Sequence, residues 1–361
     1  MCKLVELGNI CDYSTSKIMQ KNIKTSIGEY PIFGASGLIK HIDFYMQSKH
    51  YIAVVKDGAG VGRTMLLPAY SSVIGTLVVL SPKSNIDIKF LYYAISNMNL
   101  GKYRTGATIP HIYFKDYKKE RLLLPDIEKQ IKVAAILTTL DEILLLKKQQ
   151  ITKLDILIKS KFLEIFGDPV VNKKNWEIAK LSSLGTLERG KSKHRPRNDP
   201  ILLGGQYPLI QTGDIAKSGV YLFDYNETYS EEGLMQSKLW PKETLCITIA
   251  ANIAKTSILT FDSCFPDSIV GFLSNGKVTN IFIHYWFSFF QKILEDQAPE
   301  SAQKNINLKI LKNLDIIHPP IQLQTKFTEF VDQVEKTKRE IEKSIEQLEI
   351  LKKSLMQKYF G

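Results

Sequence analysis

One segment of the sequence carries a basic side chain at every second position: Arg189, Lys191, Lys193, Arg195 and Arg197. In an extended chain, side chains two residues apart point to the same side. The pattern therefore predicts a row of positive charges along one edge, and such a row can follow the phosphates of a nucleic acid. The alternative interpretation is a flexible, exposed loop whose charges are solvated.

Two further basic segments lie in the first third of the chain. Lys56 and Arg63 flank the glycine-rich run Gly58–Gly62. The glycines of this run are spaced G-x-G-x-G, which does not fit the dinucleotide-binding pattern G-x-G-x-x-G. We therefore predict a β-hairpin whose flanking charges either reach phosphate or remain solvated. The other segment combines a ring that can stack on a base with cations that can pair with phosphate or guanine: Lys102, Tyr103 and Arg104.

The distribution of charge points in the same direction. The chain of 361 residues has a formal net charge of +11. Residues 1–125 hold 16 basic and 8 acidic side chains, a net charge of +8, whereas residues 168–318 have a net charge of only +1. An excess of positive charge favours a polyanionic partner, and here the excess lies mainly in the first globular segment.

Signatures of catalysis and metal binding are absent from the sequence. It has no N-P-P-Y-type or D-P-P-Y-type segment for amino methylation and no Walker A motif. The 4 cysteines form no C-x-x-C pair and the 6 histidines form no H-x-x-x-H pair. We therefore expect no catalytic residue, no metal and no cofactor on this chain. The cysteines suit a reducing cytoplasm, and no apolar run approaches the roughly 20 residues that span a bilayer, so we expect a cytoplasmic protein without a membrane partner.

The elements that must position these residues occur twice, because the sequence contains an internal repeat. The segment KLVELG at Lys3–Gly8 recurs as KLSSLG at Lys180–Gly185, an offset of 177. Towards the end of each copy, Phe166-Gly167 matches Phe360-Gly361 at an offset of 194. Because the offset grows, we expect the second copy to carry loop insertions in its globular part.

Each copy consists of a globular segment followed by a long helix. Short apolar runs such as Tyr51–Val55, bounded by Gly, Pro, Asn and Ser, are typical of strands. A helix of about 40 residues is predicted after Pro125 in the first copy and after Pro320 in the second. We therefore predict an α+β protein with two pseudo-repeated globular α/β domains and two long helices. The expected boundaries are 1–125, 126–167, 168–318 and 319–361.

Both helices follow the same heptad frame, which predicts coiled-coil packing. The apolar seam of the first helix consists of Leu137, Leu140, Leu144, Ile151, Leu154 and Ile158. The same frame, shifted by 194 residues, gives the second seam: Val331, Val334, Ile341, Ile345, Leu348 and Leu355. We infer that the two helices pair with each other in an antiparallel coiled coil. The alternative is two separate amphipathic helices, each lying on its own domain.

Lysines interrupt this seam at different levels in the two copies: Lys147 and Lys161 in the first helix, Lys338 and Lys352 in the second. We expect these lysines to help fix the register of the helices. A helix of about 40 residues is about 60 Å long. An antiparallel pair of this length would hold two globular domains at a set separation, as needed to read successive grooves on one face of B-DNA.

The order of these motifs resembles that of type I restriction–modification specificity subunits. The stretches TGATIPHI at Thr105–Ile112 and LLLPDIEKQ at Leu122–Gln130 resemble the junction between target-recognition domain and helix in that family. In the second copy, AQKNIN at Ala302–Asn307 and HPPIQLQ at His318–Gln324 resemble the same junction. The hairpin Val55–Arg63 resembles another recurrent family segment. The resemblance covers essentially the whole chain in the order domain, helix, domain, helix.

The resemblance implies that two target-recognition domains bind the halves of a bipartite site in double-stranded DNA. It also implies two methyltransferase subunits docked on the helices, and restriction subunits recruited to the complex. In that family S-adenosylmethionine is bound by the methyltransferase subunits, and the adenine amino nitrogen is modified. In the second copy the hairpin counterpart Ile249–Thr256 has lost the glycines. From this copy we add Lys255 and Lys304 as candidate DNA contacts.

Two other functions stay open on the sequence alone. One is a coiled-coil interaction protein that joins other proteins without binding DNA. The other is a stand-alone DNA-modifying enzyme, which would transfer methyl groups without other subunits. Salt-dependent DNA binding, measured with and without a methyltransferase partner, distinguishes the interaction protein from a sequence reader.

Overall fold

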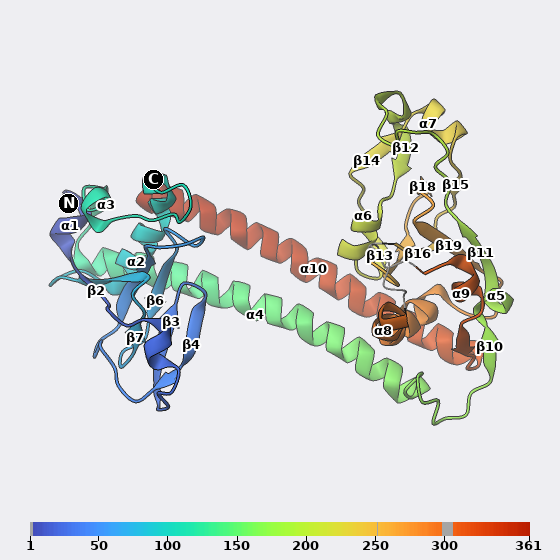
Figure 1. The fold of residues 1–361 in the computed structure, drawn as a ribbon, viewed down its shortest axis with the longest axis horizontal. Coiled ribbons are helices and arrows are strands. Elements are labelled where there is room, and N and C mark those ends of the chain that lie inside the picture. The colour runs from blue at the N-terminus through green and yellow to red at the C-terminus, as the bar shows by residue number, and fades with distance from the viewer. Residues whose placement is uncertain (1–2, 251, 298–305) are drawn as a thin grey trace. The chain divides into compact units, whose positions relative to one another are not determined.

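The computed structural model describes residues 3–250, 252–297 and 306–361 (Figure 1). The chain divides into two compact units. The first unit consists of Met1–Gln149 together with Glu342–Gly361, and the second consists of Gln150–Ile341. Each unit contains one globular domain and a part of each long helix.

The first domain is built on two sheets, closed by a short pair of strands. Strand β1 (Lys3–Glu6) pairs antiparallel with β9 (Arg121–Leu124), which joins the start of the domain to its end. After helix α1 (Leu7–Ile10), a four-stranded sheet has the order β2-β8-β5-β6, with strands Cys11–Thr15, Leu77–Pro82, Tyr51–Val55 and Thr64–Leu67. A three-stranded sheet has the order β4-β3-β7, with strands Gly37–Ile42, Tyr30–Gly34 and Ser72–Val73.

Helix α2 (Ile88–Asn97) packs on the four-stranded sheet. It begins after Asp87, whose carboxylate accepts a hydrogen bond of 2.8 Å from the amide of Phe90 and so caps the first turn. Phe90 and Leu91 lie in one core cluster with Ile52 of strand β5, all at most 1% exposed. The remaining short helices of this domain are η1 (Gln20–Ile23), η2 (Leu100–Tyr103) and α3 (Phe114–Tyr117).

The second domain repeats the strand order of the first. Strand β10 (Ile178–Lys180) pairs with β20 (Asp315–Ile317), as β1 pairs with β9. The larger sheet has the order β11-β19-β16-β17-β13, with strands Gly185–Arg189, Ile269–Ser274, Leu245–Thr248, Thr256–Leu259 and Tyr221–Leu222. The other sheet has the order β14-β12-β18-β15, with strands Glu227–Tyr229, Leu203–Leu209, Ser263–Cys264 and Leu239–Trp240. Strands β12 and β18 run parallel, as β3 and β7 do.

The second domain also contains the insertions that its sequence predicts. Helices α5 (Leu181–Leu184), α8 (Asn280–Gln297) and α9 (Leu308–Lys312) take the places of α1, α2 and α3. The additional elements are β13, β15, η3 (Pro200–Leu202), α6 (Thr212–Lys217) and α7 (Glu231–Met235). The prediction of two pseudo-repeated α/β domains is therefore confirmed.

In the first unit, the two long helices run antiparallel. Helix α4 (Ile127–Phe166) and helix α10 (Ile321–Phe360) are each 40 residues long. Asp141 forms an ion pair with Lys352. The Nζ atom of Lys148 lies 2.9 Å from a carboxylate oxygen of Glu349. From the first of these pairs to the second, the residue number rises along α4 and falls along α10. The two helices therefore run in opposite directions.

The second unit shows the same sense of pairing. Lys338 of α10 lies 2.7 Å from Asp155 of α4. The rings of Phe162 and Phe166 each lie 5.5 Å from the ring of Phe327. The predicted antiparallel coiled coil is thus present in each unit, and the alternative of two unpaired helices is wrong. Lys338 and Lys352 are accommodated because each meets an aspartate of the other helix.

A buried glutamine ties each long helix to its own domain. The side-chain amide of Gln130 donates to the carbonyl of Pro125 at 2.9 Å, and its oxygen accepts from the amide of Asp87 at 2.9 Å. Gln324, which is 194 residues later, donates to Pro319 at 2.8 Å and accepts from the amide of Thr279 at 3.0 Å. The exposed fractions of the two glutamines are 1% and 0%. The first turn of each long helix is therefore held against the start of α2 or α8.

Candidate nucleic-acid interface

The glycine-rich hairpin of the first domain lies against the segment that precedes helix α3. The amide of Gly58 donates to the carbonyl of Pro110 at 2.8 Å, and the amide of Ile112 donates to the carbonyl of Lys56 at 2.9 Å. Gly62 has a φ of +88°, and a Cβ there would lie 2.7 Å from the amide nitrogen of Gly101. Glycine is therefore required at the point where the hairpin meets the start of η2. The candidate residues of the first domain are thus carried on adjoining backbone segments.

The two basic side chains that flank the hairpin differ in the groups of the protein that they contact. Lys56 is half-buried, and its Nζ atom lies 3.3 Å from the carboxylate of the neighbouring Asp57. Arg63 is exposed and donates from Nη1 to the carbonyl of Ala35 at 3.1 Å. A carbonyl leaves the charge of Arg63 uncompensated, so Arg63 is the better phosphate ligand of the two.

Glu120 contacts two of the three candidate residues in the segment Lys102–Arg104. Lys102 lies 2.5 Å from the Glu120 carboxylate, and the hydroxyl of Tyr103 donates to the same oxygen. This hydrogen bond raises the pKa of Tyr103 to about 12. Burial raises the pKa of Glu120, but the contacts with Lys102 and Tyr103 outweigh it and hold this pKa below its usual value. Arg104 is exposed and forms no ion pair with any part of the chain that the structure describes.

The basic segment of the second domain does not form the single row that alternation predicts. Arg189 donates from Nε to the carbonyl of Asp267 at 2.8 Å, and Arg197 lies 2.7 Å from the carboxylate of the same residue. The guanidinium of Arg195 donates to the carbonyls of Ser192 and His194, each at 2.7 Å. The chain is extended only through Arg189 at the end of β11 and turns over residues 194–197. The arginines are therefore held by the domain's own oxygen atoms.

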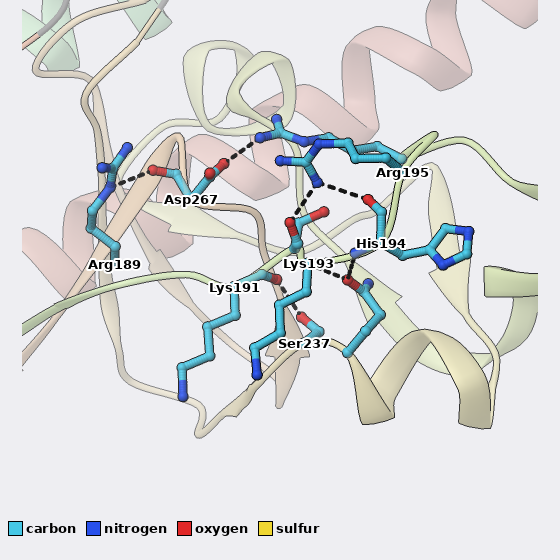
Figure 2. A network of polar contacts seen from close by, with 10 residues as sticks. Arg189, Lys191, Lys193, His194, Arg195, Ser237 and Asp267 are labelled. Carbon is cyan, nitrogen blue, oxygen red and sulfur yellow. Dashed lines mark hydrogen bonds and ion pairs between the residues drawn. The ribbon is translucent and has the colours of Figure 1, made fainter.

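Lys191 and Lys193 behave differently from these arginines (Figure 2). Their backbone is fixed, because Ser237 donates to the carbonyl of Lys191 at 2.9 Å and the Gln236 side chain accepts from the amide of Lys193 at 2.6 Å. Their side chains extend from the same side of the segment. Both are exposed, so these two lysines remain the accessible part of the predicted row.

The second domain repeats one backbone contact of the first. The amide of Ile306 donates to the carbonyl of Ile249 at 3.0 Å, which corresponds to the contact from Ile112 to Lys56. Lys255, in the counterpart of the hairpin, is half-buried and lines a cavity instead of standing on an open surface. Lys304 lies outside the described residues.

The residues assigned to the helix seam are all buried or half-buried. Seven are at most 8% exposed: Leu137, Leu140, Leu144, Ile158, Val331, Val334 and Ile341. The other five are half-buried: Ile151, Leu154, Ile345, Leu348 and Leu355. In the second unit, the seam continues into the aromatic cluster of Phe162, Phe166 and Phe327, which the heptad frame did not include.

Two features of the helices were missed by the sequence analysis, although the offset of 194 could have found them. One is the glutamine tie of Gln130 and Gln324. The other is a pair of exposed apolar residues that recurs on both helices. Ile156 and Leu157 of α4 are 58% and 46% exposed, and Ile350 and Leu351 of α10 are 63% and 47% exposed.

Other classes of site find no support in the described residues. No group of three or more His, Cys, Asp or Glu side chains there could hold a metal ion. Cys11, Cys246 and Cys264 are free and buried, and burial raises the pKa of each thiol. Among the described helices, none is both long enough and apolar enough to cross a lipid bilayer.

A family model described as type I restriction modification DNA specificity domain matches residues 2–155 and 173–350. The chain belongs to this family. Its two matched segments each contain one of the globular domains described above. The resemblance inferred from the order of the sequence motifs is therefore confirmed.

Relatives and solved structures of the type I specificity family agree with this assignment. A Haemophilus influenzae protein named as a type I restriction enzyme specificity subunit is 21% identical over 348 residues, which cover 92% of this chain and 86% of the relative. A Methanocaldococcus jannaschii protein with the same kind of name is 24% identical over 301 residues, covering 78% of this chain and 69% of the relative.

Two solved structures share the fold of this chain. The S subunit of a type I restriction-modification system from M. genitalium has a TM-score of 0.70 at 16% identity, and the match covers 100% of this chain and 96% of that chain. A structure described in terms of complex assembly and conformational transition of the type I R-M system has a TM-score of 0.59 at 16% identity, covering 99% and 97%.

Proposed function

We propose that this chain selects the DNA sequence on which a type I restriction–modification complex acts. Each globular domain, at residues 1–125 and 168–318, binds one half of a bipartite target in double-stranded DNA. The helices at 126–167 and 319–361 dock methyltransferase subunits, and restriction subunits join the same complex. The chain itself carries no catalytic group, and S-adenosylmethionine binds to the methyltransferase subunits.

The observation that supports this proposal is that the two domains share one fold but carry different exposed side chains. Both domains have the same sheet order and the same backbone contact between the hairpin region and the segment before α3 or α9. The exposed basic side chains on these frameworks differ, with Arg63 and Arg104 on one and Lys191 and Lys193 on the other. Phosphate contacts from such residues set the position on DNA, and unlike loops allow two unlike half-sites to be read.

The exposed apolar pairs on the helices support the docking of two copies of one partner. Ile156-Leu157 and Ile350-Leu351 occupy equivalent positions in the repeat, and adjacent exposed apolar residues that recur in both copies are typical of a repeated protein–protein contact. The exposed pair Leu145-Leu146 has no such counterpart, because Arg339 and Glu340 stand at the equivalent positions. We assign the repeated pairs to two methyltransferase subunits, one on each.

Adenine methylation mapped across the genome, with and without the gene for this chain, tests the proposed selection of DNA. A bipartite motif should lose its methylation when the chain is absent and recover it when the chain is restored. Methyl transfer by the purified chain alone, or a methylation pattern unchanged by its loss, would contradict the proposal. Binding of target DNA that weakens steeply with salt, in the presence of the methyltransferase, excludes a protein that only joins other proteins.

Native mass spectrometry of the reconstituted complex tests the docking surfaces. The wild-type chain should carry two methyltransferase subunits. The double variant Ile156→Asp with Leu157→Asp should lose one copy, and Ile350→Asp with Leu351→Asp should lose the other. Leu145→Asp with Leu146→Asp is the matched control and should keep both copies. Retention of two subunits by the first two variants contradicts the assignment.

A further inference from the structure

A polar cavity in the second unit lies outside the basic surface described above. It has a volume of about 310 Å³, which is within the usual range for small-molecule sites. Helices α4, α8 and α10 contribute to its wall, together with the segment 215–220 and the start of β17. All of its lining residues belong to the same compact unit.

One cluster of ionised side chains in the wall has a net charge of −1, because one ammonium pairs with two carboxylates. The ammonium of Lys338 lies 2.7 Å from the carboxylate of Asp155 and 2.8 Å from that of Glu335. The side chains of Lys338 and Glu335 are only 12% and 10% exposed. Because two carboxylates surround one ammonium, Lys338 is already satisfied and is not the group that attracts a ligand.

Two other lysines in the wall supply positive charge that this cluster does not use. Lys159 of α4 and Lys255 beside β17 both line the cavity. Within the residues that the structure describes, neither ammonium forms an ion pair or a side-chain hydrogen bond. With Asp155, Glu335 and Lys338 counted, the charged wall has a net charge of +1. The balance favours an anion.

His284 adds a neutral polar group to the same wall. Its Nδ1 atom lies 2.9 Å from the hydroxyl oxygen of Thr256, whereas Nε2 has no hydrogen-bond partner among the described residues. Burial, reinforced by the nearby charge of Lys338, lowers the pKa of His284 to about 4. The ring is therefore neutral at neutral pH, and a nitrogen of the neutral ring can donate a hydrogen bond to an oxyanion. Ser218 and Ser288 also line the wall, but their hydroxyls already donate to the carbonyls of Asp214 and Tyr285.

We propose that this cavity binds a phosphate group through Lys159, Lys255 and His284. Lysine is a suitable ligand for phosphate as a point charge, and the imidazole supplies a directional hydrogen bond. The phosphate comes either from a small free molecule or from the backbone of the bound DNA. The chemistry that recognises it is the same in both cases.

Titration of the full chain with inorganic phosphate, followed by NMR of the histidine side chains, tests this site. The His284 resonance, assigned by its loss in His284→Gln, should shift and saturate with phosphate but not with chloride at equal ionic strength. Lys159→Gln and Lys255→Gln should each weaken phosphate binding at least about ten-fold, the loss expected when a charged hydrogen bond is removed. Lys326→Gln, an exposed lysine of α10 in the same unit but outside the cavity, is the matched control and should leave the binding unchanged.

A second titration with a short DNA duplex separates the two sources of phosphate. A shift of the same resonance by the duplex, reversed by inorganic phosphate, assigns the site to DNA. A shift by inorganic phosphate alone assigns it to a free molecule. If neither ligand moves the His284 resonance, or if both lysine variants keep full binding while their thermal unfolding is unchanged, the proposal is wrong. Loss of DNA selection without loss of phosphate binding would overturn only the proposed function.

Discussion

The two domains have one framework and two different surfaces. The strand order β2-β8-β5-β6 of the first domain recurs as β11-β19-β16-β17 in the second, and both close with an antiparallel pair of terminal strands. Yet the segment 1–125 has a net charge of +8 and the segment 168–318 has +1. The first keeps a hairpin with glycines at positions 58, 60 and 62, and the second has α6 and α7 inserted.

The comparison separates what the fold requires from what it leaves free. The repeated parts are backbone pairings, apolar cores and the glutamine ties, all of which position the helices. The unlike parts are exposed loops and charges, which can change without disturbing the core. The variants below compare equivalent positions of the two copies, beginning with the largest expected effect.

We expect the two copies to differ most in stability where the core packs against the end of each long helix. Phe162 is fully buried among Phe166, Phe282 and Phe327, whereas its counterpart in the repeat, Met356, is half-buried. We expect Phe162→Ala to lower the free energy of unfolding by about 4 kcal/mol and Met356→Ala by about half as much or less. All 3 tryptophans lie in the second unit, so tryptophan fluorescence during urea unfolding follows Phe162→Ala. Far-UV circular dichroism follows Met356→Ala, and equal losses would contradict the contrast.

The glutamine ties should instead behave alike. Gln130→Ala and Gln324→Ala each leave a buried backbone amide and a carbonyl without their partner, which costs about 2 kcal/mol. Gln149→Ala and Gln333→Ala, at exposed positions of the same helices, serve as controls and should change stability little. A large loss in one copy and none in the other, measured by urea unfolding, would show that the two ties are not equivalent.

The response to acid that arises from a buried histidine should occur in the second unit. The unfolded chain takes up a proton at His284 near pH 6.5, whereas the folded chain does so only near pH 4. The folded state is therefore progressively destabilised as the pH falls from 6.5 to 4, and this contribution is absent above that range. In His284→Gln the tryptophan-detected unfolding midpoint, measured in buffers without phosphate, should depend less on pH. In the first unit, the position five residues after the tied amide of Asp87 is occupied by Tyr92, so that unit has no imidazole at the equivalent place.

The smallest effects are expected for single phosphate contacts. Arg63→Gln with Arg104→Gln in the first domain, and Lys191→Gln with Lys193→Gln in the second, should each weaken DNA binding about three- to ten-fold in the assembled complex. Each lost contact should reduce the slope of log affinity against log salt by about 0.9. Lys326→Gln, an exposed lysine on α10, is the control. If neither pair changes the slope, these side chains do not contact phosphate.

Periodicity predicted the framework because burial leaves a regular pattern in sequence. The heptads gave the seam residues, and the shared offset gave the repeat of two domains. Side-chain partners distant in sequence leave no such pattern. Nothing near Lys102 indicates that Glu120 neutralises it, and the alternation of Arg189–Arg197 does not reveal that Asp267 holds two of the arginines. The same is true of His284 and Lys338, which line one cavity only after α8 and α10 pack in the same unit.

The glutamine ties have a consequence for how such proteins can diversify. The side chains of Gln130 and Gln324 bond to main-chain atoms, namely the amides of Asp87 and Thr279 and the carbonyls of Asn85, Pro125 and Pro319. A main-chain carbonyl is present at every residue and a main-chain amide at every residue except proline, so these hydrogen bonds tolerate substitution of the residues that supply them. A domain with a wholly different reading surface could be grafted onto the same helix by recombination and would still be seated in the same orientation.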